Sequence, residues 1–102
     1  MTFKSDIIDR INTDFGETTT EAKKIIVDAI SKDDNLKSDR VIRCIIYLAK
    51  GDLEDLNNYI MSAIVDTRDV MFWAEYSGIN EGKKPMHLRD FSKTFDECSN
   101  EL

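Results

Sequence analysis

Histidine, cysteine, glycine and proline are all scarce in this chain. Its 102 residues include one histidine (His87), two cysteines (Cys44 and Cys98), four glycines and one proline. A zinc site needs more cysteine and histidine ligands than these, and nucleophilic catalysis needs a base beside its nucleophile, whereas no histidine lies close in sequence to either cysteine. A glycine-rich phosphate loop is also missing. We therefore expect no catalytic constellation and no cofactor.

The chain also has no long apolar run. Its longest stretch without a charged residue, 56–65, falls far short of the roughly twenty apolar residues that span a membrane. The first residues, Met-Thr-Phe-Lys-Ser-Asp, do not place a basic region before an apolar one, as a signal peptide does. Cys44 lies in the apolar run 41–49, where a buried thiol packs well. These features predict a cytoplasmic protein in a reducing compartment.

Positive charge is in deficit as well. Fourteen basic residues face twenty acidic ones, which gives a net charge of -6 and a pI near 4.7. A field of this sign repels nucleic acid and anionic lipid, so we expect neither nucleic acid nor a membrane as partner. One basic patch contains an aromatic residue and is formed by Arg40, Arg43, Tyr47 and Lys50. We expect it to be a solvated face of a helix or to form salt bridges with the helix that follows.

What the chain does have is apolar residues, 41% of the total, at helical spacing. No segment alternates with period two, and no Asn-Gly or Asp-Gly turn joins apolar runs. We therefore predict an all-α protein, a small bundle of about four helices plus a C-terminal tail or short helix. A chain of this length fits one domain, with residues 1–78 as the helical body and residues 79–102 as a linker and a tail that packs on it.

Local signals predict where the first three helices begin and end. The first covers about residues 5–15, where Gly16 ends it. The second follows Thr18-Thr-Thr-Glu21, which has the pattern of a capping box. The third begins after Ser38, a good N-cap residue, and ends before Gly51.

The fourth helical segment, residues 52–76, is the longest, with Asp52 as its cap. At about 1.5 Å per residue it would measure about 37 Å, whereas the earlier helices of about twelve residues reach about 18 Å. We therefore expect this segment either to overhang the bundle or to break near Asp66 and Thr67.

The second half of that segment loses its polar face. Val70, Phe72, Trp73 and Tyr76 add apolar surface on several sides of the helix. Exposed apolar patches of this kind mark contact surfaces, so these four residues are the predicted interface.

Two partners can cover this predicted interface. One is the tail of the same chain, in which apolar residues recur at helical spacing as Leu88, Phe91 and Phe95. The other is a second copy of the protein in a symmetric contact. The sequence leaves both open.

Four charged residues interrupt the apolar end of the segment: Asp66, Arg68, Asp69 and Glu75. Because charge is tolerated there only when it is paired or wet, we expect Asp66 or Asp69 to face an arginine of the third helix. The predicted charge network comprises Arg40, Arg43, Asp66, Arg68 and Asp69.

The functional prediction is a small protein-interaction or accessory module that binds itself, as a homodimer, or another protein. Aromatic residues favour that interpretation because interfaces are enriched in them. Two alternatives remain: a metal-dependent phosphohydrolase that uses Asp66 and Asp69, and an acidic regulator, of the antitoxin or immunity type, that masks a basic surface.

Overall fold

The protein is all-α, as predicted. A computed structural model describes residues 3–77, 86–87 and 89–99. In this part of the chain the helices are α1 (Ser5–Phe15), α2 (Thr19–Lys32), α3 (Asp39–Ala49), α4 (Leu53–Val65), α5 (Thr67–Glu75) and α6 (Phe95–Ser99). Two short strands, β1 (Tyr76–Ser77) and β2 (Met86–His87), form one antiparallel ladder. The expectation of no sheet therefore fails only at these two residue pairs.

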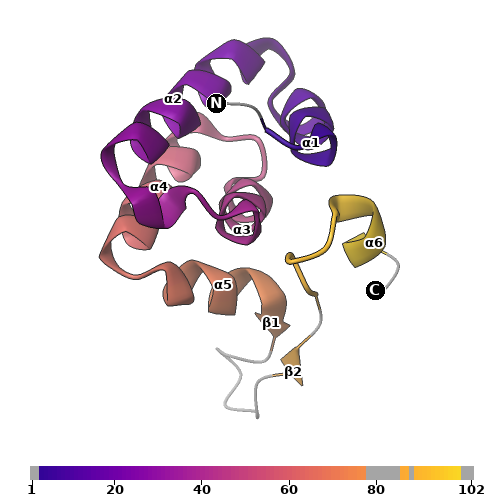
Figure 1. Ribbon diagram of the computed structural model, residues 1–102. Helices are drawn as coiled ribbons and strands as arrows, with labels where there is room; N and C mark the ends of the chain where they lie inside the picture. The colour runs from indigo at the N-terminus through magenta and orange to yellow at the C-terminus, as the bar shows by residue number, and fades with distance from the viewer. Residues whose placement is uncertain (1–2, 78–85, 88, 100–102) are drawn as a thin grey trace.

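Helix α3 is the centre of the molecule. Figure 1 shows it nearly end-on, with α1, α2, α4 and α5 arranged around it, and it contacts α1, α4 and α5. All six consecutive residues 41–46 are buried, including Cys44 and the charged Arg43. A helix buried on all sides in this way must be apolar nearly all round, which its run of Val, Ile and Leu provides.

Helix α1 covers the predicted range, but the capping box predicted for α2 is wrong. Lys4 precedes α1, and no side chain caps it. Thr18 makes no cap hydrogen bond either; its hydroxyl donates instead to the carbonyl of Phe15 at 2.8 Å. The reason is that residues 16–18 form a turn of 3-10 helix, so Thr18 continues a helical path and its hydroxyl points back along the chain.

The caps of α3 and α4 are where the sequence predicts them. The Ser38 hydroxyl accepts from the amide of Val41 at 3.3 Å, and the Asp52 carboxylate accepts from the amide of Asp55 at 3.1 Å. Between these helices Gly51 adopts φ +81°, and a Cβ there would stand 2.2 Å from the carbonyl oxygen of Asp14. Only glycine fits at this close approach to α1.

The long segment 52–76 breaks at Asp66, the second of the two outcomes predicted for it. Asp66 has an extended backbone (φ -160°, ψ 112°), which ends α4, and its carboxylate accepts from the amide of Arg68 at 2.9 Å, which caps α5. The break lets α5 fold back and pack against both α3 and α4. One side of α5 is therefore buried, and the helix does not project from the bundle.

The C-terminal segment returns to the body after the β1–β2 ladder. Phe91 and Phe95 are both buried in the main core, while Leu88 and the predicted boundary between residues 78 and 79 lie outside the described residues. Figure 1 shows α6 beside α1, at the opposite edge of the molecule from α4.

Candidate interaction surface on α5

Helix α5 buries one side and exposes large rings on the other. Val70 and Ala74, four residues apart, are fully buried against α3 and α4. Phe72 and Trp73 lie on the opposite side and are 37% and 42% exposed. Tyr76, at the end of the helix, is half-buried. The prediction that Val70 belongs to the interface is therefore wrong, because the fold-back of α5 turns it into the core.

The exposed rings are held by other rings. Phe72 packs on Tyr76 with ring centroids 5.1 Å apart, and Trp73 meets Tyr59 of α4 edge to face at 6.2 Å. Such pairs add packing energy beyond the area they bury. Phe72 and Trp73 are therefore fixed in orientation although water reaches them.

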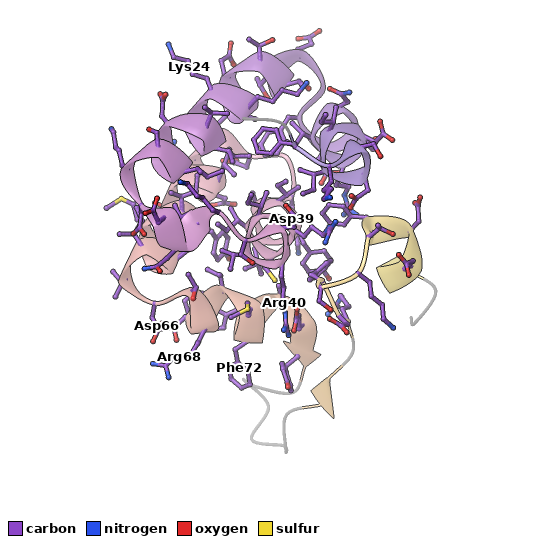
Figure 2. The ribbon with its side chains drawn as sticks, in the orientation of Figure 1. Lys24, Asp39, Arg40, Asp66, Arg68 and Phe72 are labelled. Atoms are coloured by element: carbon purple, nitrogen blue, oxygen red, sulfur yellow. The ribbon has the colours of Figure 1, made fainter. Side chains whose placement is uncertain are left out.

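A groove of about 480 Å³ runs beside Phe72. Its lining comprises Arg40, Arg68, Asp69, Met71, Phe72, Glu75 and Tyr76. Figure 2 shows Arg40 reaching from α3 toward α5, and Arg68 and Phe72 pointing away from the body. The groove thus joins aromatic surface to two guanidinium groups.

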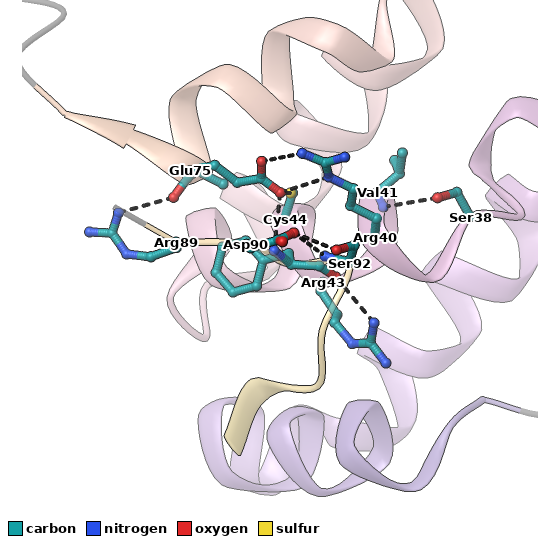
Figure 3. Close-up of polar contacts among 11 residues, drawn as sticks. Ser38, Arg40, Val41, Arg43, Cys44, Glu75, Arg89, Asp90 and Ser92 are labelled. Carbon is teal, nitrogen blue, oxygen red and sulfur yellow. Dashed lines mark hydrogen bonds and ion pairs between the residues drawn. The ribbon is translucent and has the colours of Figure 1, made fainter. Parts of the chain in front are cut away.

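Arg40 and Glu75, which both line this groove, form an ion pair. The Arg40 Nε donates to Glu75 Oε2 at 2.8 Å, and its Nη2 donates to Oε1 (Figure 3). The Glu75 side chain is 1% exposed. Hydrogen bonding to Glu75 raises the pKa of Arg40 above its ordinary value. A forked contact of this kind fixes both side chains.

The predicted partners of the α3 arginines are wrong. Neither Asp66 nor Asp69 pairs with Arg40 or Arg43, because the break at Asp66 carries both aspartates away from α3. Asp66 pairs instead with Arg68, two residues on, at 2.8 Å. This contact and the amide of Arg68 lower the pKa of Asp66.

Arg43 was expected to lie on a solvated face or to pair with the fourth helical segment, and it does neither. Its side chain is 6% exposed and makes a forked contact with Asp6 of α1, at 2.9 and 3.1 Å. Burial by itself would raise the pKa of Asp6, but the hydrogen bonds from Arg43 and from the amide of Phe95 outweigh it, so that the pKa is lowered.

Sequence reasoning missed Asp6, the acceptor of Arg43, and it singled out Glu75 without assigning it to Arg40. Asp6 shares a polar helix face with Arg10, so no local signal marked it, and a helical pattern does not identify the partner on another helix. It also missed the apolar side chains that α4 exposes, Met61, Ile64 and Val65. Ile64 follows the buried Ile60 by four residues, which is the spacing of an inward helix face, yet it is 45% exposed.

The residues that the structure describes contain neither a cluster of metal-ligand side chains nor a long apolar helix. No three His, Cys, Asp or Glu side chains gather there as metal ligands would, and both carboxylate oxygens of Asp66 are bonded to Arg68. None of the described helices is both long and apolar enough to cross a bilayer.

Comparison with known proteins adds no function. No protein-family model matches the chain, and it matches neither a curated protein nor a solved structure. Phe72, Trp73, Tyr76 and the groove beside them are here called the α5 surface.

Proposed function

We propose that this protein is a protein-interaction module that associates with a second copy of itself through the α5 surface. The observation that carries the proposal is the pair of adjacent rings, Phe72 and Trp73, which are 37% and 42% exposed on a helix whose other side is fully buried. Aromatic side chains that water reaches but that their neighbours hold in place lose little entropy on contact, which suits them as anchors of an interface.

The charges around these rings favour a second copy as the partner. Arg68 and Asp69 are adjacent at the rim of the groove, both exposed and opposite in sign. In a two-fold contact the same patch meets itself, so Arg68 of each copy can face Asp69 of the other. Within the groove lining, Arg40 and Arg68 balance Asp69 and Glu75, which reduces the repulsion between two chains that each carry a net charge of -6.

The test is the mass of the purified protein in solution. Light scattering is expected to report a dimer for the unaltered chain and a monomer for Trp73→Ala, which should still unfold in one cooperative transition because Trp73 lies outside the buried core. Met61→Ala, which removes an apolar side chain that is 67% exposed on α4, is the matched control and should stay dimeric. A Trp73→Ala variant of unchanged mass and intact stability would remove the α5 surface from the contact.

We also propose a cytoplasmic location. Supporting it are the low cysteine content and the burial of Cys44 as a thiol within the core, since small secreted domains are usually rich in disulfides.

A further inference from the structure

The C-terminal segment, residues 89–95, lies on buried charged side chains of the body. Glu75 Oε2 accepts from the amide of Phe91 at 3.1 Å, and Arg43 Nη1 donates to the carbonyl of Phe91 at 3.1 Å. Asp6 Oδ2 accepts from the amide of Phe95, also at 3.1 Å. Figure 3 shows Arg43 and Glu75 reaching this segment from α3 and α5. The body therefore binds the backbone of the segment through side chains.

Each of these charges already has a partner within the body. Glu75 is paired with Arg40, and Arg43 with Asp6. A buried charge is strongly unfavourable only when it is left unpaired, so departure of the segment leaves both ion pairs in place. The surface beneath the segment is thus already organised, with carboxylate oxygens and a guanidinium N–H held ready for a peptide backbone.

Two rings of the segment supply the apolar part of the contact. Phe91 is 1% exposed and packs on Tyr47 of α3 at 5.2 Å, and Phe95 meets Phe91 edge to face at 5.7 Å. Two cations add to this contact: Arg10 of α1 lies over the Phe95 ring, and Arg89 of the segment lies over the Tyr47 ring. Backbone hydrogen bonds combined with pockets for spaced side chains are how folded domains recognise peptides.

We propose that the surface formed by Asp6, Arg43, Tyr47 and Glu75 is a peptide-recognition site, here called the tail site, and that residues 89–95 of a second copy occupy it by exchange. The ligand is a segment with phenylalanines four residues apart. Its two cations, Arg89 and Lys93, outnumber its one anion, Asp90, which suits a body of negative net charge.

The proposed exchange specifies how two copies associate, and it rests on the proposed function for the existence of the dimer. Residues 78–88, which include β2, join β1 at the end of α5 to the segment that begins at Arg89. At about 3.5 Å per residue they reach at most about 39 Å. Because Glu75, at the end of α5, belongs to the tail site, a reciprocal exchange places the α5 ends of the two copies within about that distance of each other. Exchange of identical elements is a recognised route to dimers.

The first test uses a labelled peptide of residues 86–97 and the full-length Phe91→Ala chain, whose own segment binds weakly. Saturable binding is expected, with a Kd at least tenfold lower than that of a control peptide in which both phenylalanines are alanine. The unaltered chain should bind at least tenfold more weakly, because its own segment competes at a high effective concentration. Equal affinity for both peptides overturns the tail site, and Phe95→Ala replaces Phe91→Ala if the latter does not fold.

The second test separates exchange from contact through the α5 surface. Ser77 pairs with Met86 across the ladder, and paired Cα atoms of an antiparallel ladder stand about 4.5–5.5 Å apart, which a disulfide can span. In a chain that carries Ser77→Cys, Met86→Cys and Cys98→Ser, oxidation should therefore link the two strands within one chain if the segment folds back on its own body, and between two chains if the segment is exchanged. A dimer that resists denaturant and separates only with reductant supports exchange. A disulfide within one chain overturns exchange, and it supports the proposed function where the protein in solution is still a dimer that Phe72→Ala and Trp73→Ala dissociate.

Discussion

Two arginines of α3 join the neighbouring helices, each through a forked contact with one buried carboxylate. Arg40 binds Glu75 of α5, and Arg43 binds Asp6 of α1. Because the guanidinium fork matches a carboxylate in only a few orientations, each pair selects one rotation of its helix about its own axis. We infer that single charged residues specify how α1 and α5 meet α3.

Asp6 makes this pairing testable by pH. Its folded-state pKa is lowered from 3.8, so it adds stability above that value, and this contribution is lost as the pH falls through the lower folded-state value. Asp6→Asn should reduce the free energy of unfolding at neutral pH by about 3 kcal/mol, since it leaves Arg43 buried without its counter-charge.

Urea unfolding at neutral pH and at about pH 3 measures both effects. The variant should lose less stability on acidification than the unaltered chain does. Equal losses would show that Asp6 titrates alike in the folded and unfolded states.

Gly51 offers a second prediction at the scale of one residue. Gly51→Ala places a Cβ against the Asp14 carbonyl at a positive φ, whereas Gly16→Ala, at φ +50°, meets no atom within 4 Å. The first should cost more than about 2 kcal/mol and the second about 1 kcal/mol, because only the first adds a clash to backbone strain. Thermal and urea unfolding of both variants provide the comparison, and the reverse order would contradict the close approach.

At the scale of the element, one residue decides which rings face water. The extended backbone of Asp66 ends α4, and its carboxylate starts α5. The change of direction turns Val70 and Ala74 inward and leaves Phe72 and Trp73 outside. A continuous helix would have left the rings on a projecting rod, so the α5 surface exists because of this break.

Helix caps provide the prediction that belongs to this scale. Ser38→Ala removes the acceptor for the amide of Val41 and should cost about 1 kcal/mol. Thr18→Ala is the matched control, because the Thr18 hydroxyl caps no amide, and it should cost less. Ser38→Asp should retain the stability of the unaltered chain. Chemical denaturation of the three variants checks this, and an equal loss for Ser38→Ala and Thr18→Ala would contradict the assigned cap.

At the scale of the whole molecule, the C-terminal segment completes the core. Phe91 and Phe95 belong to the same apolar cluster as the residues of α1 and α3, although they lie far along the chain. The core formed by residues 3–77 is therefore completed by a segment from the C-terminal part of the chain, which packs on it at the tail site.

Large-to-small substitutions measure this dependence. Phe91→Ala should lower the free energy of unfolding by about 3–5 kcal/mol, as is usual for a buried phenylalanine. Phe72→Ala, a matched change at a ring that is 37% exposed, should cost about 1 kcal/mol or less. Denaturant unfolding below the concentration at which the protein associates makes the comparison. Similar losses for the two variants would contradict the placement of Phe91 in the core.

Much of the local structure could be predicted from sequence. Helical spacing of apolar residues indicated the all-α class, Gly16 marked the end of α1, and Ser38 and Asp52 marked the starts of α3 and α4. These features depend on neighbours within about one turn, so the residues involved are adjacent in the printed sequence. The burial of Cys44 followed from the same spacing.

The candidate surface was predictable only in part. Phe72 and Trp73 stood out because they remove the polar face of their helix. Val70 was assigned to the same surface, although it is buried. An apolar residue near the end of a helix fits both places equally well, and only the position of α3 decided between them. The capping box predicted at Thr18 was wrong for a different, local reason, because residues 16–18 form a 3-10 turn.

By itself, the sequence determined the all-α class, the caps of α3 and α4 and the place at which the fourth segment could break, because hydrogen bonding and apolar spacing act over a few residues. The tertiary structure alone decided the partners of the buried charges: Glu75 for Arg40, Asp6 for Arg43, and both carboxylates for the backbone of residues 91–95. Ion pairing depends on distance in space, and up to 89 residues of chain separate the groups that meet here.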